Sequence, residues 1–233
     1  MSYRTRISKS LIAAATLASV ALGTSSVFAC GGAWVPFLMD DDINHRIDGV
    51  ARAEKKLEAG GSLNAAASVI RMMPHIRNIA PGRSKLTDRA QRILAVSLSR
   101  NGGALLVGEQ VPAYALDGWD GKSSEQREEN LQWAVGTLRA QSEKKSDDPV
   151  LKVELAEALS RVDTYRSEAK QILEGMAKRD LIPSARGYAV VSELRKAEGD
   201  TAGAQRARER CLTMAKDASV CGEAQPSQPG GAS

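Results

Sequence analysis

Carboxylates and one histidine gather early in the chain, where binding of a divalent cation is the chemistry to consider. The segment "DDDINHRID" places Asp40, Asp41, Asp42 and Asp48 around His45, and carboxylate oxygens are ligands for hard cations. The segment lacks the loop spacing and the sharp-turn glycine of an EF-hand. We therefore expect a solvated acidic stretch that stabilises the N-terminus of the first helix, and we assign no metal ligand.

Catalytic chemistry based on histidine or bound phosphate has few components here. Neither His45 nor His75 lies near a cysteine or pairs with another ligand at helical spacing, so a zinc site or an activated nucleophile lacks its parts. No glycine-rich stretch carries the lysine and hydroxyl of a phosphate-binding loop. Arg127, Glu128 and Glu129 fit a solvated helix face. We expect a protein that is not an enzyme and that has no cofactor.

A run of basic residues is the strongest electrostatic signal inside the chain. Between Arg71 and Arg100 there are seven Lys or Arg residues and one acid, Asp88. Such a run favours an anionic surface or partner. A solvated helix face is the alternative, and it suits a chain of small net charge. The candidate patch for an anionic partner consists of Arg71, Arg77, Arg83, Lys85, Arg89 and Arg92.

The first of the three cysteines follows a segment with the pattern of a secretory signal. Cys30 comes after a positively charged start and an uncharged apolar run over residues 11–23 that is too short to span a bilayer. Val27 and Ala29 place small residues three and one positions before it. This pattern predicts a signal peptide over residues 1–29 that is removed on export.

Export changes the charge balance of the chain. The full chain has 32 Lys and Arg against 28 Asp and Glu, and cleavage before Cys30 removes three of these cations. The mature chain is then nearly neutral, so attraction to nucleic acid is not supported. We expect a bacterial protein that lies in the periplasm or is anchored to the outer membrane.

Two roles for Cys30 stay open. "VFAC" resembles the lipid-attachment box of bacterial lipoproteins, in which cleavage exposes a cysteine that carries the lipid. Lipidation would leave Cys211 and Cys221 as an even pair for a disulfide beside the end of the last helix. Alternatively, Cys30 pairs with a C-terminal cysteine, because the apolar stretch "AWVPFLM" follows it almost at once in place of a polar tether.

The remainder of the chain is rich in helix-forming residues, which predicts an all-α domain over residues 44–222. Apolar residues recur at helical spacing from Ile47 to Leu57, stop at "GG" and resume in "LNAAASVIRMM", as in a helical hairpin. Pro149 and Pro183 each open another hairpin, about 34 residues apart. The domain is therefore expected to consist of helix pairs.

This period and these hairpins resemble the tetratricopeptide-repeat family, most clearly over residues 148–216 and more faintly over residues 46–102. The Gly199-Asp200 turn matches the family's pattern. The resemblance implies a short α-solenoid of antiparallel helix pairs, and it implies the family's role as a scaffold for other proteins. An irregular helical bundle is the alternative fold.

One long inserted loop interrupts the helical pattern. Residues 103–122 contain glycines, a proline and two aromatics, and loops of this length are uncommon unless they have a function. Aromatic residues are enriched in interface hot spots, so those outside the repeats are candidates to contact a partner. Tyr114 and Trp119 could instead fasten the insertion to the solenoid. The candidates are Trp34 and Phe37, in an extended segment over residues 30–43, with Tyr114 and Trp119.

These features together predict an exported scaffold or adaptor that binds a protein or peptide partner in the cell envelope. Residues 223–233 are expected to form a disordered tail. Two alternatives remain. An envelope enzyme would need the acidic segment and the insertion to converge in one pocket, and a purely structural lipoprotein would need no groove.

Overall fold

Every secondary-structure element among the described residues is a helix. The computed structural model describes residues 35–107, 111–116 and 118–222, with side chains from Asp42 onward. The chain divides after Met39, and the fold below belongs to the unit that begins at Asp40. The predicted all-α class is confirmed. The helices are α1 (Val35–Glu58), α2 (Ser62–Met72), α3 (Lys85–Arg100), α4 (Ala113–Leu116), α5 (Ser124–Lys144), α6 (Pro149–Ser160), α7 (Arg166–Ala177), α8 (Ala185–Ala197) and α9 (Thr201–Met214), with short 3-10 helices η1 (Ile76–Asn78), η3 (Asp163–Tyr165) and η4 (Ala218–Cys221).

Local capping signals set where several of these helices begin. The Ser123 side chain accepts a hydrogen bond from the Gln126 backbone N–H at 3.1 Å, and the Gln126 side chain completes a capping box at the start of α5. Asp148 caps α6, and Pro149 takes the first helical position, where its missing N–H costs nothing. The predicted helix start at Pro149 is correct, and α8 begins two residues after Pro183.

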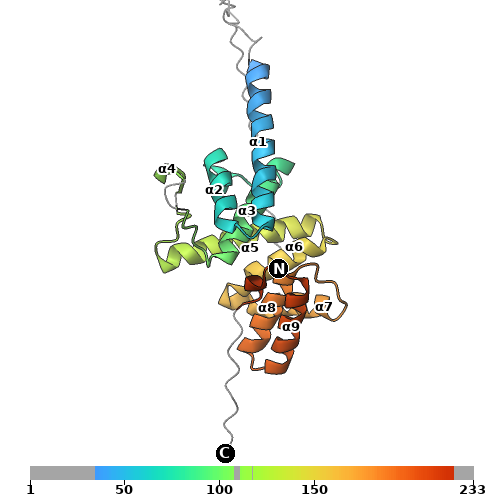
Figure 1. Cartoon of the computed structure of the whole chain (residues 1–233). Helices are drawn as coiled ribbons and strands as arrows, with labels where there is room; N and C mark the ends of the chain where they lie inside the picture. Colours follow the sequence, from blue (N-terminus) through green and yellow to red (C-terminus); the bar gives the residue numbers. More distant parts are fainter. Residues whose placement is uncertain (1–34, 108–110, 117, 223–233) are drawn as a thin grey trace, which may run out of the picture. The chain divides into compact units, whose positions relative to one another are not determined.

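The helices pack as successive pairs. α1 turns into α2 through Ala59–Gly61, α6 packs against α7, and α8 packs against α9. Further contacts join α2 to α3, α3 to α5, α5 to α6 and α6 to α8, so each pair packs on its neighbours. Figure 1 shows α8 and α9 side by side in orange and red. This arrangement agrees with the predicted short α-solenoid of helix pairs.

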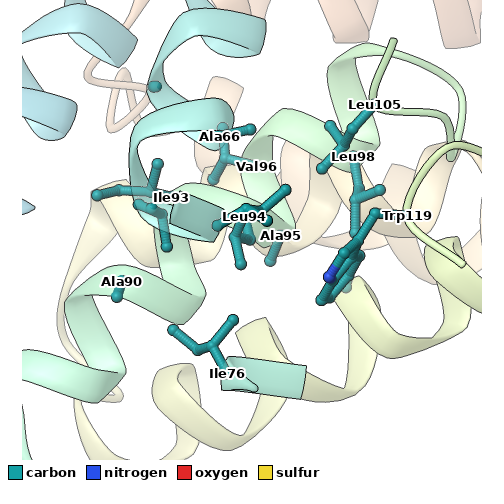
Figure 2. Packing of buried hydrophobic residues seen from close by; sticks show 14 of the residues in the cluster. Ala66, Ile76, Ala90, Ile93, Leu94, Ala95, Val96, Leu98, Leu105 and Trp119 are labelled. Atoms are coloured by element: carbon teal, nitrogen blue, oxygen red, sulfur yellow. The ribbon is translucent and has the colours of Figure 1, made fainter. Parts of the chain in front are cut away.

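The larger of two cores, here called the N-terminal core, lies mainly among α1, α2, α3, α5 and α6. It contains bulky, fully buried side chains, among them Ile70, Leu94 and Trp119. Figure 2 shows Trp119 close to Leu98 and Leu105 at one side of this cluster. Burial of such large apolar surfaces is the dominant favourable contribution to folding.

The second core, here called the C-terminal core, lies among α6, α7, α8, α9 and η4. Small residues such as Ala189 and Ala207 take part in it, which allows α8 and α9 to approach closely. A disulfide between Cys211 and Cys221, with an S–S distance of 1.98 Å, joins α9 to η4. The predicted pairing of these two cysteines is confirmed, whereas Cys30 lies outside the described residues.

Helix α6 contributes to both cores. Leu155 and Leu159 belong to the N-terminal core, and Val153 and Ala156 belong to the C-terminal core. From Leu151 to Ser160, every residue except Lys152 is buried. A helix that is buried on all sides must lie in the interior of the domain.

The start of α1 differs from the predicted extended segment over residues 30–43, because the helix already begins at Val35. Pro36 falls in the first turn, where a missing N–H costs no hydrogen bond, and no glycine interrupts the helix between Val35 and Gly49. Asp42 and Arg46 also form an ion pair at 2.8 Å between neighbouring turns of the same helix. Much of the acidic stretch is therefore helical.

Candidate functional site

A groove between α1 and α2 is lined mainly by cationic and polar side chains. Its volume is about 480 Å³. Four of the side chains that line it are Arg or Lys, and one is a carboxylate. The lining residues are Asp42, His45, Arg46, Gly49, Arg52, Lys56, Ser68, Arg71 and Met72.

Helical spacing explains why these residues meet. His45, Gly49, Arg52 and Lys56 recur every three or four residues, so they share one face of α1. Gly49 leaves room at the centre of this face, because a Cβ there would collide with the Met72 side chain from α2. A residue with a side chain at position 49 would require the end of the Met72 side chain to move.

The cations of the groove differ in how they are neutralised. Arg46 is paired with Asp42. Arg52, Lys56 and Arg71 form no ion pair with any carboxylate whose side chain the structure describes. An anionic ligand would be attracted to these cations.

The Lys56 ammonium is held in place by a neutral partner. Its Nζ donates a hydrogen bond to Ser68 Oγ at 2.9 Å, and Ser68 Oγ donates in turn to the Asn64 carbonyl at 2.9 Å. Ser68 is buried, which fixes the hydroxyl in the groove wall. An ammonium has three donors, so Lys56 keeps hydrogen-bonding capacity for a ligand.

The six basic residues predicted to form one anionic-partner patch occupy different environments. Arg89 donates to Glu54 at 2.8 Å, which joins α3 to α1, and Arg92 donates to Glu154 at 2.6 Å, which joins α3 to α6. The hydrogen bond from Arg89 holds the pKa of Glu54 below its ordinary value. Arg83 is exposed in the turn before α3. Arg89 and Arg92, which both lie in α3, therefore join helices.

A second, smaller recess between α3, α5 and the start of α6 contains three of the predicted patch residues. Its volume is about 240 Å³. Its two carboxylates already have partners: Asp88 accepts from the Gly82 backbone N–H at 2.6 Å, and Asp148 caps α6. Its positive charge is reduced further by the two pairs made by its arginines. The lining residues are Lys85, Asp88, Arg89, Arg92, Gln141, Lys144, Lys145, Asp148 and Leu151.

Trp119 belongs to the core and is unavailable to a partner, which corrects its assignment as a contact residue. The side chain is 1% exposed. Its ring packs edge-on against Trp133, with 4.9 Å between ring centroids. The Arg77 guanidinium lies over the same ring, 4.6 Å from its centroid. Of the two roles considered, Trp119 has that of fastening the insertion.

Hydrogen bonds to the backbone fix the ends of the insertion around this tryptophan. Asn130 Nδ2 donates to the carbonyls of Gly103 and Gly118, both at 2.8 Å. The Leu105 N–H donates to the Trp119 carbonyl at 2.8 Å. Gly121 has a φ of +59°, and a Cβ there would lie 2.8 Å from the Gly103 carbonyl, so the close approach requires glycine. The insertion is anchored at both ends.

The other aromatic candidates differ from Trp119. Tyr114 lies on the short helix α4 and is 76% exposed, so it remains accessible. Phe37 lies in α1 and is helical, contrary to expectation, but its side chain is outside the described part of the structure. Trp34 also lies outside the described residues.

The described residues offer neither a cluster of metal ligands nor a membrane-spanning helix. Among the described residues, no group of three or more His, Cys, Asp or Glu side chains lies close enough together to hold a metal ion. None of the described helices is long and apolar enough to cross a membrane.

The buried Glu157 side chain lies between Arg186 at 2.7 Å and Arg100 at 3.5 Å, where it joins α6 to α8 and α3.

The fold and the groove define an all-α protein of packed helix pairs with a cation-lined recess. No family model, no curated protein and no solved structure matches this chain. Of the basic residues that line the groove, the sequence pattern predicts Arg71 as a site candidate but does not indicate Arg46, Arg52 or Lys56. Their shared face on α1, centred on a glycine, is the signal that could have found them.

Proposed function

We propose that this chain is an exported helical-repeat scaffold that binds a protein or peptide partner in the bacterial cell envelope. The observation that carries the proposal is the α1–α2 groove, in which Arg52, Lys56 and Arg71 line an open recess without a paired carboxylate among the described side chains. Stacked helix pairs form extended surfaces of the kind that hold other proteins. The likeness of the α6–α7 and α8–α9 hairpins to tetratricopeptide repeats favours the same role.

Glu54 and Glu174, two carboxylates with a lowered pKa, do not match the needs of acid–base catalysis. The pKa of Glu54 is lowered by its hydrogen bond to Arg89, and the pKa of Glu174 is lowered by its hydrogen bond to Arg195. A general base or acid needs a pKa near the working pH, and a lowered carboxylate pKa moves away from it. Both carboxylates also join neighbouring helices. Their pKa values are explained by structural ion pairs.

The proposed attachment is through a lipid on Cys30. The chain has three cysteines, and the bond between Cys211 and Cys221 leaves Cys30 without a second cysteine in the same chain. This favours lipidation over the disulfide alternative. Labelling cells with a fatty-acid probe should mark the protein and should fail to mark a Cys30→Ser variant. Equal labelling of both, or none, would contradict the anchor.

The scaffold function is tested by crosslinking in intact envelopes. A photoreactive residue in place of Lys56, which lines the groove, should capture one reproducible protein. The same residue in place of Lys55, which is exposed on α1 but does not line the groove, should not capture it. The photoreactive residue can also be placed at other surface positions, including the smaller recess between α3, α5 and α6. If none of these variants gives a specific crosslinked product, the proposal is overturned.

A further inference from the structure

We propose that the α1–α2 groove binds an acidic polypeptide segment of the partner through its carboxylates. The inference rests on the proposed scaffold function and adds the partner's chemistry to it. Arg52, Lys56 and Arg71 supply positive charge that no carboxylate among the described side chains offsets. Complementary charge across an interface determines which partners bind and how quickly they associate.

The unpaired cations lie on both helices that line the groove, which suits a segment of chain that runs between them. Arg52 and Lys56 are four residues apart on α1, about 6 Å along the axis, and Arg71 lines the groove from α2. One phosphate group can contact only cations that converge on it. Successive acidic side chains of an extended segment are about 7 Å apart on one face, so two of them match the spacing of Arg52 and Lys56.

The lining of the groove also fits a peptide better than a small molecule. Sites for small molecules are mostly apolar and enclose most of their ligand. Here Met72 is the one large apolar side chain among the described lining residues, and the rest of the wall is charged or polar. An acidic side chain can place its methylene groups on Met72 while its carboxylate faces Arg52 or Arg71.

One cation is already positioned for such a ligand. The hydrogen bond from Lys56 Nζ to Ser68 Oγ restricts the ammonium without neutralising it. A side chain that is held in place before binding loses less conformational entropy when the ligand arrives. Lys56 therefore gives the groove a fixed point at one end, and the Asp42–Arg46 pair limits its positive charge at the other.

Binding of a short fluorescent peptide tests the inference directly. The probe alternates glutamate with glycine, and its control alternates glutamine with glycine. We expect the purified full-length protein to bind the glutamate peptide, with affinity that falls as salt is raised from about 0.05 M to about 0.5 M. The Arg52→Glu/Arg71→Glu variant should bind it at least about tenfold more weakly.

A matched variant separates groove chemistry from net charge. Lys55 and Lys196 are exposed and line no recess described above, so Lys55→Glu/Lys196→Glu changes the net charge equally and should leave peptide binding within about twofold. Arg52→Gln/Arg71→Gln should fall between the wild type and the charge-reversed variant. Thermal unfolding of each variant within a few degrees of the wild type shows that the fold is intact.

The outcomes distinguish the inference from the function on which it rests. Equal binding of the two peptides, or equal loss in the groove and control variants, would overturn the acidic-segment inference. Binding of inorganic phosphate or of phosphatidylglycerol vesicles that needs Arg52 and Arg71, without glutamate-peptide binding, would overturn it as well. If envelope crosslinking still captures a partner in these cases, the scaffold function stands. If peptide binding depends on the groove but no partner is captured, the scaffold function fails alone.

Discussion

The N-terminal and C-terminal cores are stabilised in different ways. The N-terminal core buries bulky apolar side chains such as Trp119 and Ile70. The C-terminal core is smaller and is supplemented by a disulfide, whereas ion pairs join helices in both regions, including Glu174 with Arg195 at 2.7 Å in the C-terminal region and Arg92 with Glu154 at 2.6 Å in the N-terminal region. A core with less apolar surface to bury needs additional constraints to remain folded.

This difference bears on where a binding surface can form. In the C-terminal hairpins, Arg186, Arg195 and Arg210 are engaged with carboxylates of neighbouring segments. In the α1–α2 hairpin, Arg52 and Arg71 form no ion pair with any described carboxylate. Cations that the fold does not use for its own stability are available to a ligand.

The largest expected effect comes from removing bulk from the N-terminal core. Trp119→Ala should lower the free energy of unfolding by about 3 to 5 kcal/mol, because it removes a buried ring that contacts Trp133 and Arg77. Urea denaturation followed by circular dichroism measures the change. Tyr114→Ala, at an exposed site in the same insertion, is the control and should change stability by less than about 0.5 kcal/mol. Equal effects would remove Trp119 as the anchor of the insertion.

The next effect concerns the covalent link in the C-terminal core. Cys211→Ala/Cys221→Ala should lower stability by about 2 to 3 kcal/mol, as expected for opening a short loop whose cysteines are 10 residues apart. Reduction of the wild-type protein should produce a similar loss, and reduction of the double variant should produce none. If the double variant matches the oxidised wild type, the C-terminal core does not depend on its disulfide.

Ion pairs in the two regions should contribute different amounts to the free energy of unfolding. Arg195→Met leaves the half-buried Glu174 without its partner and also removes a hydrogen bond to the Gly203 carbonyl, so it should cost about 1 to 3 kcal/mol. Arg89→Met breaks the pair with Glu54, which is more exposed, and should cost less than about 1 kcal/mol. Chemical denaturation of both variants tests this order, and a larger loss for Arg89→Met would reverse the comparison.

The smallest expected effect is the dependence of the Arg195 contribution on pH. Its hydrogen bonds to Glu174 hold the pKa of that carboxyl below its ordinary value of 4.5. A lowered folded-state pKa means that the unfolded chain binds more protons, so the stabilisation is complete above 4.5 and is lost as pH falls through the folded-state pKa. The stability difference between wild type and Arg195→Met should therefore shrink below pH 4.5. A difference that stays constant there would show that the ion pair contributes nothing.

Local sequence signals predict much of the fold, whereas contacts between residues distant in the sequence could not be predicted. The start of α6 depends on Asp148 and Pro149, which are neighbours in the chain, and the disulfide joins two cysteines near one helix end. The partner of Arg92 is Glu154, 62 residues away, so its role in joining helices has no local sequence signal. Tertiary contacts likewise decide the burial of Trp119, which lies in an irregular segment without helical periodicity.

The position of α6 in both cores has a consequence for how the domain unfolds. Solenoids whose repeats touch only their neighbours can fray from one end while the rest stays folded. Here loss of either core would expose one side of α6, including Leu159 or Ala156, and would leave Glu157 with fewer of its arginine partners. The two regions are thus expected to melt in one cooperative step, with the amide protons of α6 exchanging with solvent only through global unfolding.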